Sequence, residues 1–234
     1  MKYLITLCCL WILLPGCSNR TGSGNMVTRV EDVASFNKIS VSGAFYVEVV
    51  PGAAEQRVQV TADDNIMEDV LVSVDEGVLK IKMRSGVNYN NVYPKVIINT
   101  SALKKISVSA SAKVQVKNTL KSSDKIQLDA SSAGTIIANV DAPGVDADAS
   151  SGSTVELTGR TQNYKAQCSS GSTIDAAELL SENTDVQASS GASAKVHASV
   201  SLKAQASSGG DVDYKGGGTV SAKESSGGSI SKVD

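Results

Sequence analysis

The chain has 234 residues, of which 22 are basic and 24 are acidic, and its formal net charge is −2 at pH 7. A partner bound through phosphate groups requires a concentrated basic surface, so this balance argues against nucleic acid as a partner. The only histidine is His197, which excludes a metal site built from several histidines.

The first sixteen residues have the features of an export signal. Lys2 provides a positive charge, and an apolar run of about twelve residues follows it, from Tyr3 to Leu14. This run is shorter than the ~20 residues that a membrane-spanning helix needs, whereas its length is typical of a secretory signal peptide. Residues 1–16 are therefore predicted to be removed on export.

The end of this signal, Leu14-Pro15-Gly16-Cys17, resembles the bacterial lipobox. In signals of that class the cysteine thiol takes a diacylglycerol, the chain is cleaved just before the cysteine, and the new amine is acylated. We therefore expect lipidation at Cys17 and a membrane as partner through this anchor. Each buried methylene contributes about 0.8 kcal/mol, so several acyl chains would hold the protein firmly. The alternative is an ordinary signal peptide that happens to end beside a cysteine.

Residues 17–29 are expected to comprise the lipidated cysteine and a flexible tether. The segment Ser18 to Asn25 is polar, contains glycine and lacks periodicity. It has no acidic run directly after the cysteine, a feature that some Gram-negative groups use to send lipoproteins to the cell exterior. We expect a lipid-anchored protein of the bacterial cell envelope, at the outer membrane, facing either the periplasm or the cell surface.

Residues 30–234 are predicted to form a single all-β domain. Between 30 and 105, six segments alternate apolar and polar residues with the two-residue period of a strand. Turn residues separate them, only residues 66–69 suggest a helical turn, and we expect this N-terminal part to contain the longer strands. The predicted strands are Ile39–Ser42, Tyr46–Val50, Arg57–Thr61, Val70–Val74, Leu79–Met83 and Lys95–Asn99.

Residues 106–234 contain seven near-copies of one pattern, in which a short apolar–polar–apolar run precedes a corner of the Ser-Ser-Gly type. The first serine of each corner is at position 109, 131, 150, 169, 189, 207 and 225. Successive copies are therefore 22, 19, 19, 20, 18 and 18 residues apart. This period is shorter than the ~33–50 residues of helical-hairpin and propeller repeats, and the alternation within each copy indicates a strand.

We predict that each copy is one coil of a parallel β-helix, a solenoid with short coils of about 18–22 residues. A chain that returns to the same place repeats its corner once per coil, whereas a sandwich or barrel of antiparallel strands reverses at every strand. Glycine accommodates the positive φ of such a corner. We expect Glu224 and its polar neighbours to cap the last coil. A second strand in each coil should begin at Val114, Ile136, Val155, Ile174, Val212 or Ile230.

Few residues in these copies suggest chemistry. Cys168 occupies the position that alanine fills in neighbouring copies, so we interpret it as a small core residue and not as a reactive thiol. His197, which we place beside Asp175 of the neighbouring coil, is assigned to the surface or to packing. A nucleophile is single, whereas these serines recur at every corner, so a ladder of hydroxyls bonded to the backbone or to the next coil explains them better.

Two acidic segments carry the oxygen ligands that calcium prefers, Asp63-Asp64-Asn65 and Asp211-Val212-Asp213. The other copies do not repeat the second segment, so a loop and a strand end explain the two segments better than a metal does. We therefore expect no catalytic residue, no metal and no cofactor. The sequence does not identify ligand-binding residues or an oligomeric state.

The chain resembles the family of auto-transporter adhesins named for its head GIN domain. The resemblance covers about residues 30–231 and is carried by the opening Phe36–Gly52, the segments Val60–Ile66 and Gly77–Ile81, the serial corners and the ending Leu202–Gly216. It implies a right-handed parallel β-helix in a bacterial envelope protein, often a lipoprotein. It implies no particular activity, because fold-level analogy is a weak guide to function.

The leading hypothesis is a non-enzymatic adhesin or scaffold that presents a long Ser-, Thr- and Asp-rich face to a polysaccharide or protein surface. The alternative is a carbohydrate-binding or polysaccharide-cleaving β-helix. Such enzymes need carboxylates and basic residues gathered on one face. Here the outward positions are mixed, and in the coils only Tyr164 and Tyr214 are aromatic residues that could stack on sugars.

Overall fold

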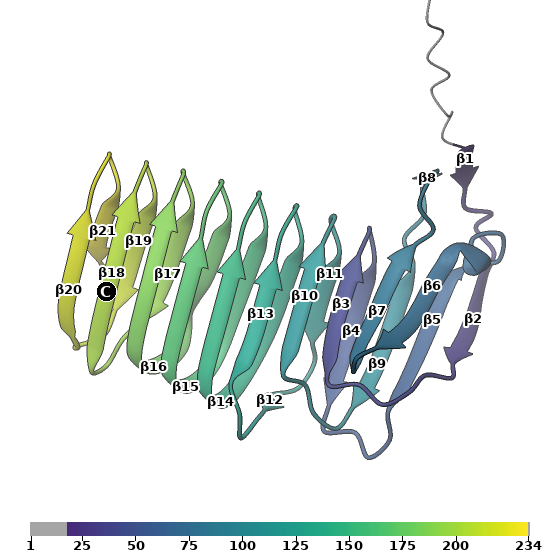
Figure 1. Cartoon of the computed structure of the whole chain (residues 1–234), viewed down its shortest axis with the longest axis horizontal. Helices are drawn as coiled ribbons and strands as arrows, with labels where there is room; N and C mark the ends of the chain where they lie inside the picture. The colour runs from purple at the N-terminus through teal and green to yellow at the C-terminus, as the bar shows by residue number, and fades with distance from the viewer. Residues whose placement is uncertain (1–17, 234) are drawn as a thin grey trace, which may run out of the picture.

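The computed structural model describes residues 18–233, so the predicted signal peptide and the predicted lipidation site, Cys17, lie outside the described residues. The described residues form strands in two layers, stacked along one long axis (Figure 1). Within this part of the chain, no helix is long and apolar enough to span a membrane.

All six segments predicted as strands between residues 30 and 105 are strands, and the predicted helical turn is a 3-10 helix, η1. The elements in chain order are β1 (Ser18–Thr21), β2 (Met26–Glu31), β3 (Lys38–Ser42), β4 (Tyr46–Pro51), β5 (Arg57–Asp63), η1 (Met67–Asp69), β6 (Val70–Asp75), β7 (Val78–Met83), β8 (Val87–Asn90), β9 (Lys95–Thr100), β10 (Lys105–Ser109), β11 (Lys113–Val116), β12 (Leu120–Lys121), β13 (Ile126–Ala130), β14 (Thr135–Ala149), β15 (Thr154–Cys168), β16 (Thr173–Ser189), β17 (Ser193–His197), β18 (Ser201–Ser207), β19 (Asp211–Lys215), β20 (Thr219–Glu224) and β21 (Ser229–Lys232).

The repeats form the predicted parallel β-solenoid. The predicted starts of the second strand lie opposite one another in the ladder, since Ile136 pairs with Val155 and Val155 pairs with Ile174. The N-terminal strands belong to the same stack, because β10 pairs in parallel with β3 and β11 pairs in parallel with β4. The coil of β3 and β4 therefore lies between the coil of β7 and β9 and the first Ser-Ser-Gly coil.

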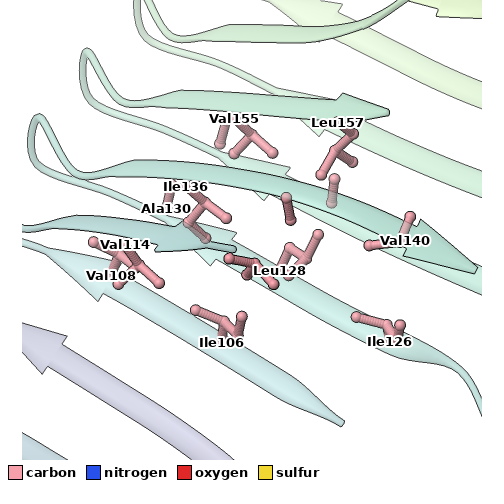
Figure 2. Packing of buried hydrophobic residues seen from close by; sticks show 14 of the residues in the cluster. Ile106, Val108, Val114, Ile126, Leu128, Ala130, Ile136, Val140, Val155 and Leu157 are labelled. Atoms are coloured by element: carbon pink, nitrogen blue, oxygen red, sulfur yellow. The ribbon is translucent and has the colours of Figure 1, made fainter. Parts of the chain in front are cut away.

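The core lies between the two layers, where each coil contributes the same inward positions. Figure 2 shows isoleucine, valine and leucine side chains of neighbouring coils meeting there. One column begins with large residues and continues mainly with alanine, because a narrow interior accommodates small side chains stacked on one another. Its members, in ladder order, are Ile39, Ile106, Leu128, Ala147, Ala166, Val186 and Ala204.

The Ser-Ser-Gly corner is a tight turn with two consecutive residues at positive φ. In the corner between β14 and β15, φ is 53° at Ser151 and 69° at Gly152. The N–H of Ser153 donates to the carbonyl oxygen of Ser150 at 3.3 Å. This is the geometry of a type I′ turn, which reverses a strand within two residues and needs positive φ at both. The sequence indicated this conformation only for glycine, and the second serine adopts it as well.

Backbone hydrogen bonds also connect the corners of successive coils. The N–H of Gly152 donates to the carbonyl oxygen of Ser170, and the N–H of Gly171 donates to that of Ser190, each at 3.1 Å. The parallel ladder therefore continues around the corner. We call the edge of the stack formed by these turns the corner edge. It is the upper edge in Figure 1.

The predicted hydroxyl ladder is made by other serines than those of the Ser-Ser pair. The hydroxyls of Ser153 and Ser172, which follow the glycines, donate to the carbonyl oxygens of Ala130 and Ala149 at 2.9 Å each. Both serines are 1% exposed. The second serine of each pair, such as Ser151, is exposed to solvent instead.

The expected flexible tether is wrong for the described residues of 17–29. β1 pairs in parallel with β8, and β2 pairs antiparallel with β5. Between β1 and β2, the N–H of Gly24 donates to Asp63 Oδ1 at 2.6 Å, and the hydroxyl of Ser23 donates to Asp64 Oδ1 at 2.6 Å. The segment has no apolar period because distant partners hold it, not a core face of its own.

The longest strands are not in the N-terminal part, as had been expected, but in the repeats. β14 and β15 have 15 residues each and β16 has 17, whereas β1 to β9 have four to seven. Each long strand passes through a bend at the edge opposite the corners without losing its ladder, so that one strand serves both layers. We call this the bend edge. It is the lower edge in Figure 1.

Polar residues close both ends of the stack. At the N-terminal end, Arg29 of β2 donates to the carbonyl oxygens of Met67 and Val70, at 3.3 and 3.1 Å. At the other end, Glu224 occupies the inward column after Ala206 and accepts a hydrogen bond from the N–H of Ile230 at 2.7 Å. Glu224 therefore covers the last described coil, in the capping role predicted for it.

The bend edge also contains a glycine whose replacement should be costly. Gly159 has φ of 108°, and a Cβ there would collide with the carbonyl oxygen of Val140 in the preceding coil. We expect Gly159→Ala to lower the free energy of unfolding by about 2–5 kcal/mol, because backbone strain and overpacking add. Gly152→Ala, with positive φ but no atom within 4 Å of the new Cβ, should cost only about 1–2 kcal/mol. Urea denaturation measures both, and equal losses would contradict this packing.

Candidate functional site

Cys168 is a core residue, as its column indicated. It pairs with Ala149 on one side and with Ala188 on the other, and it is 4% exposed. Its thiol lies 3.6 Å from the carbonyl oxygen of Gln187, to which it donates a weak hydrogen bond. Burial raises the pKa of the Cys168 thiol to about 12. The thiol is therefore protonated at neutral pH.

His197 does not lie beside Asp175, contrary to the sequence interpretation. Asp175 pairs with Lys195, so His197 lies two residues further along the ladder. The prediction was wrong because the coils differ in length between these two positions. The carbonyl oxygen of His197 accepts hydrogen bonds from the hydroxyls of Ser181 and Thr184. Its Nδ1 is buried and has no hydrogen-bond partner among the described residues.

The two acidic segments considered for calcium have structural roles. Asp63 and Asp64 hold the loop between β1 and β2, and Asp213 lies opposite Lys195 in the ladder. Among residues 18–233, no group of three or more His, Cys, Asp or Glu side chains is placed to hold a metal ion. Of the two tyrosines considered for sugar stacking, Tyr164 is buried and Tyr214 packs against the core.

The broad faces of the solenoid carry ladders of like or paired side chains. One outward column runs Ser107, Asp129, Asp148, Gln167, Gln187 and Gln205. Burial, and then the neighbouring carboxylate of Asp129, raise the pKa of Asp148. The adjacent column contains ion pairs between successive coils, such as Lys203 Nζ to Asp185 Oδ2 at 2.9 Å. These faces are regular and of mixed charge.

The bend edge is hollowed into a groove across β14, β15 and β16, with a volume of about 630 Å³. Its floor is the column Ala142, Thr161 and Ser181, all buried and in register. Ser181 and Thr161 have their hydroxyl protons engaged, with His197 and Asn163 carbonyl oxygens respectively. We call this hollow the bend-edge groove.

The walls and end of the groove come from the residues beside that floor. One wall is a ridge formed by Asp141, Arg160 and Leu180, which are successive members of one column. The facing wall and the end of the groove are formed by Pro143, Gln162, Glu182, His197 and Ser199.

The ridge combines a fixed charge pair with an exposed apolar side chain. Arg160 donates from Nε to Asp141 Oδ1 at 3.0 Å and from Nη2 to Oδ2 at 2.8 Å, a two-pronged pairing. The hydrogen bonds from Arg160 lower the pKa of the Asp141 carboxyl. Leu180 is 58% exposed. The ridge therefore offers a guanidinium edge and an apolar surface side by side.

The groove forms because coil lengths change at the bend edge. The ladder between β15 and β16 has an irregularity after Glu156, where the coil spacing grows from 19 to 20 residues, since Glu156 pairs with Asp175 and Thr158 with Glu178. The following coil is shorter, since Asn183 pairs with Ser201. The uneven steps of 20 and then 18 residues between corner serines were visible in the sequence, but their location at the bend was not.

One family model matches residues 35–218, with the description "putative auto-transporter adhesin, head GIN domain". No curated protein matches the chain significantly. Among solved structures, one described as a putative adhesin from Bacteroides fragilis has a TM-score of 0.84 at 20% identity, and covers 92% of this chain and 100% of its own.

Two further similar structures come from Parabacteroides. A putative adhesin from Parabacteroides merdae has a TM-score of 0.73 at 19% identity, and covers 93% of this chain and all of its own. A protein from Parabacteroides distasonis described as a putative lipid binding protein has a TM-score of 0.73 at 20% identity, with the same coverage. At these identities the likeness shows the fold alone.

The burial of Cys168 predicts an unreactive thiol. In a Cys17→Ala variant, which leaves Cys168 as the only thiol of the exported chain, we expect labelling by Ellman's reagent at pH 8 to be far slower in the native protein than in urea. The cause is the raised pKa together with burial, because the thiolate is the attacking species. Native labelling as fast as that of free cysteine would show that the column position is accessible.

Proposed function

Since the chain belongs to the head GIN domain family of auto-transporter adhesins, we propose that it is a lipid-anchored, non-enzymatic adhesin or scaffold of the bacterial cell envelope. The family match supports this most directly, because it spans residues 35–218 and so includes the stack from β3 to β19. The partner is a polysaccharide or a protein surface. Membership in an adhesin family fits a location in the cell envelope or at the cell surface.

The anchor in this proposal is Cys17, at the outer membrane. Its support is the Leu14-Pro15-Gly16-Cys17 sequence, together with the place where the described chain begins. β1 starts at Ser18, directly after the cysteine, and is tied to β8, so the anchor would join an ordered body without a long tether. β1 lies at the level of the corner edge, opposite the bend edge (Figure 1). An anchor there would leave the bend edge facing away from the membrane.

The binding role is supported by the form of the surface. The faces repeat the same polar positions coil after coil, ~4.8 Å apart, which suits contact with an extended partner. The alternating lysine and aspartate residues of one outward column, such as Lys203 and Asp185, keep this surface hydrated and of mixed charge. Such a surface can hold a partner by many weak contacts.

The anchor is tested by labelling exporting cells with radioactive palmitate. We expect label in the intact chain and in Cys168→Ala, which lacks only the buried core thiol, and no label in Cys17→Ala. The reason is that the acyl chains are attached at the mature N-terminal cysteine. Equal label in Cys17→Ala and in the intact chain would refute the anchor.

The binding role is tested with beads that carry the purified mature chain. We expect the beads to be retained on at least one of three coatings, namely mucin, fibronectin and peptidoglycan, with no soluble sugar released from mucin or peptidoglycan. Beads that carry bovine serum albumin are the control. Retention equal to that control on all three coatings, or release of sugar with time, would contradict a non-enzymatic adhesin.

A further inference from the structure

We propose that the bend-edge groove binds a segment of a neutral glycan chain. This inference rests on the proposed function in one respect, namely that the protein binds a partner without transforming it. It adds the place on the fold, the chemical class of the partner and the residues that contact it. None of the broad faces offers a comparable hollow with both polar and apolar walls.

The polar groups around the groove match the hydroxyls of a sugar. A hydroxyl both donates and accepts, so a site for sugars needs donors and acceptors on more than one side. Arg160 offers its remaining N–H groups on the ridge, and on the facing wall Gln162 offers both kinds of group. Below them, the hydroxyl protons of Thr161 and Ser181 are already donated to backbone carbonyls, so the two floor oxygens are left as acceptors.

Apolar contact is available from both walls. Leu180 protrudes from the ridge with 58% of its surface exposed, although the neighbouring Leu179 is buried completely. Pro143 lies on the facing wall, and Ala142 lies on the floor. Sugar rings carry C–H faces beside their hydroxyls, and such faces pack on aliphatic side chains. An exposed leucine beside a fixed guanidinium edge is therefore suited to one sugar ring.

The charges of the lining favour a neutral partner. Arg160 and Asp141 neutralise each other through their two-pronged pairing. Glu182, on the facing wall, forms no ion pair within residues 18–233 and leaves a net negative charge at the groove. A uronic acid polymer would be repelled by this carboxylate, and so would a phosphate-bearing chain.

The dimensions favour a short segment of a linear chain. The groove runs along the stack axis across three coils, and its walls repeat once per coil at ~4.8 Å. Its volume of about 630 Å³ lies within the range of about 300–1,000 Å³ typical of ligand sites, and is too small for a folded partner. The bend edge lies opposite β1, so an anchored protein would present the groove outward (Figure 1).

The proposal is tested by calorimetric titration of the purified mature chain with cellohexaose, laminarihexaose and mannohexaose, and with hexagalacturonate as the acidic counterpart. We expect at least one neutral hexasaccharide to bind. Arg160→Ala and Leu180→Ser should each weaken that binding at least tenfold. Lys203→Ala, which removes an ion pair of the same kind from a broad face, should leave it unchanged. Because all three side chains are exposed, circular dichroism should show unchanged folding.

Absence of binding to all three neutral hexasaccharides would overturn the proposal, and so would tighter binding of hexagalacturonate or equal binding by the two groove variants. The bead assay separates this failure from failure of the proposed function. Beads retained on a coating, by a protein that binds none of the hexasaccharides, would leave the adhesin role standing and the groove without its ligand. Loss of both would remove both.

Discussion

The structure depends on one constraint, that the backbone ladder must close around every coil. A parallel stack needs each coil to pair with the next along its whole path, corners included. The two-residue turn satisfies this because its middle amide donates to the following corner, as Gly152 does to Ser170. Two consecutive positive φ values are required for this reversal. The recurrence of Ser-Ser-Gly follows from that backbone requirement, and catalysis is not needed to explain it.

The same constraint decides where the sequence can vary. The corner edge keeps its two-residue turn throughout, and the inward columns are narrow, which explains alanine and Cys168 at equivalent places. Changes in coil length are accommodated at or near the opposite edge, where the irregularity after Glu156 precedes a shorter coil. Polar side chains such as Thr161 and Ser181 enter the interior there. The groove therefore occurs where the ladder tolerates irregularity.

This distinction also explains what sequence could predict. Features that repeat in register were predictable, namely the coil period, the starts of the second strands and the core role of Cys168, because each copy confirms the others. Features that depend on one distant partner were not. β1 has no apolar period and is held by β8 and by the loop at Asp63. His197 was placed wrongly because a local change in coil length shifts the ladder, and the groove depends on the same change.

The claim that the ladder continues through exposed corners can be tested directly by amide hydrogen exchange. We predict that the amides of Gly152, Gly171 and Gly191 are protected nearly as well as those of the adjoining strands, although these glycines are solvent-exposed. Gly227, whose corner is the last one described and has no further coil to bond, provides the internal comparison and should exchange quickly. Fast exchange at all four glycines would contradict a ladder that closes around every coil.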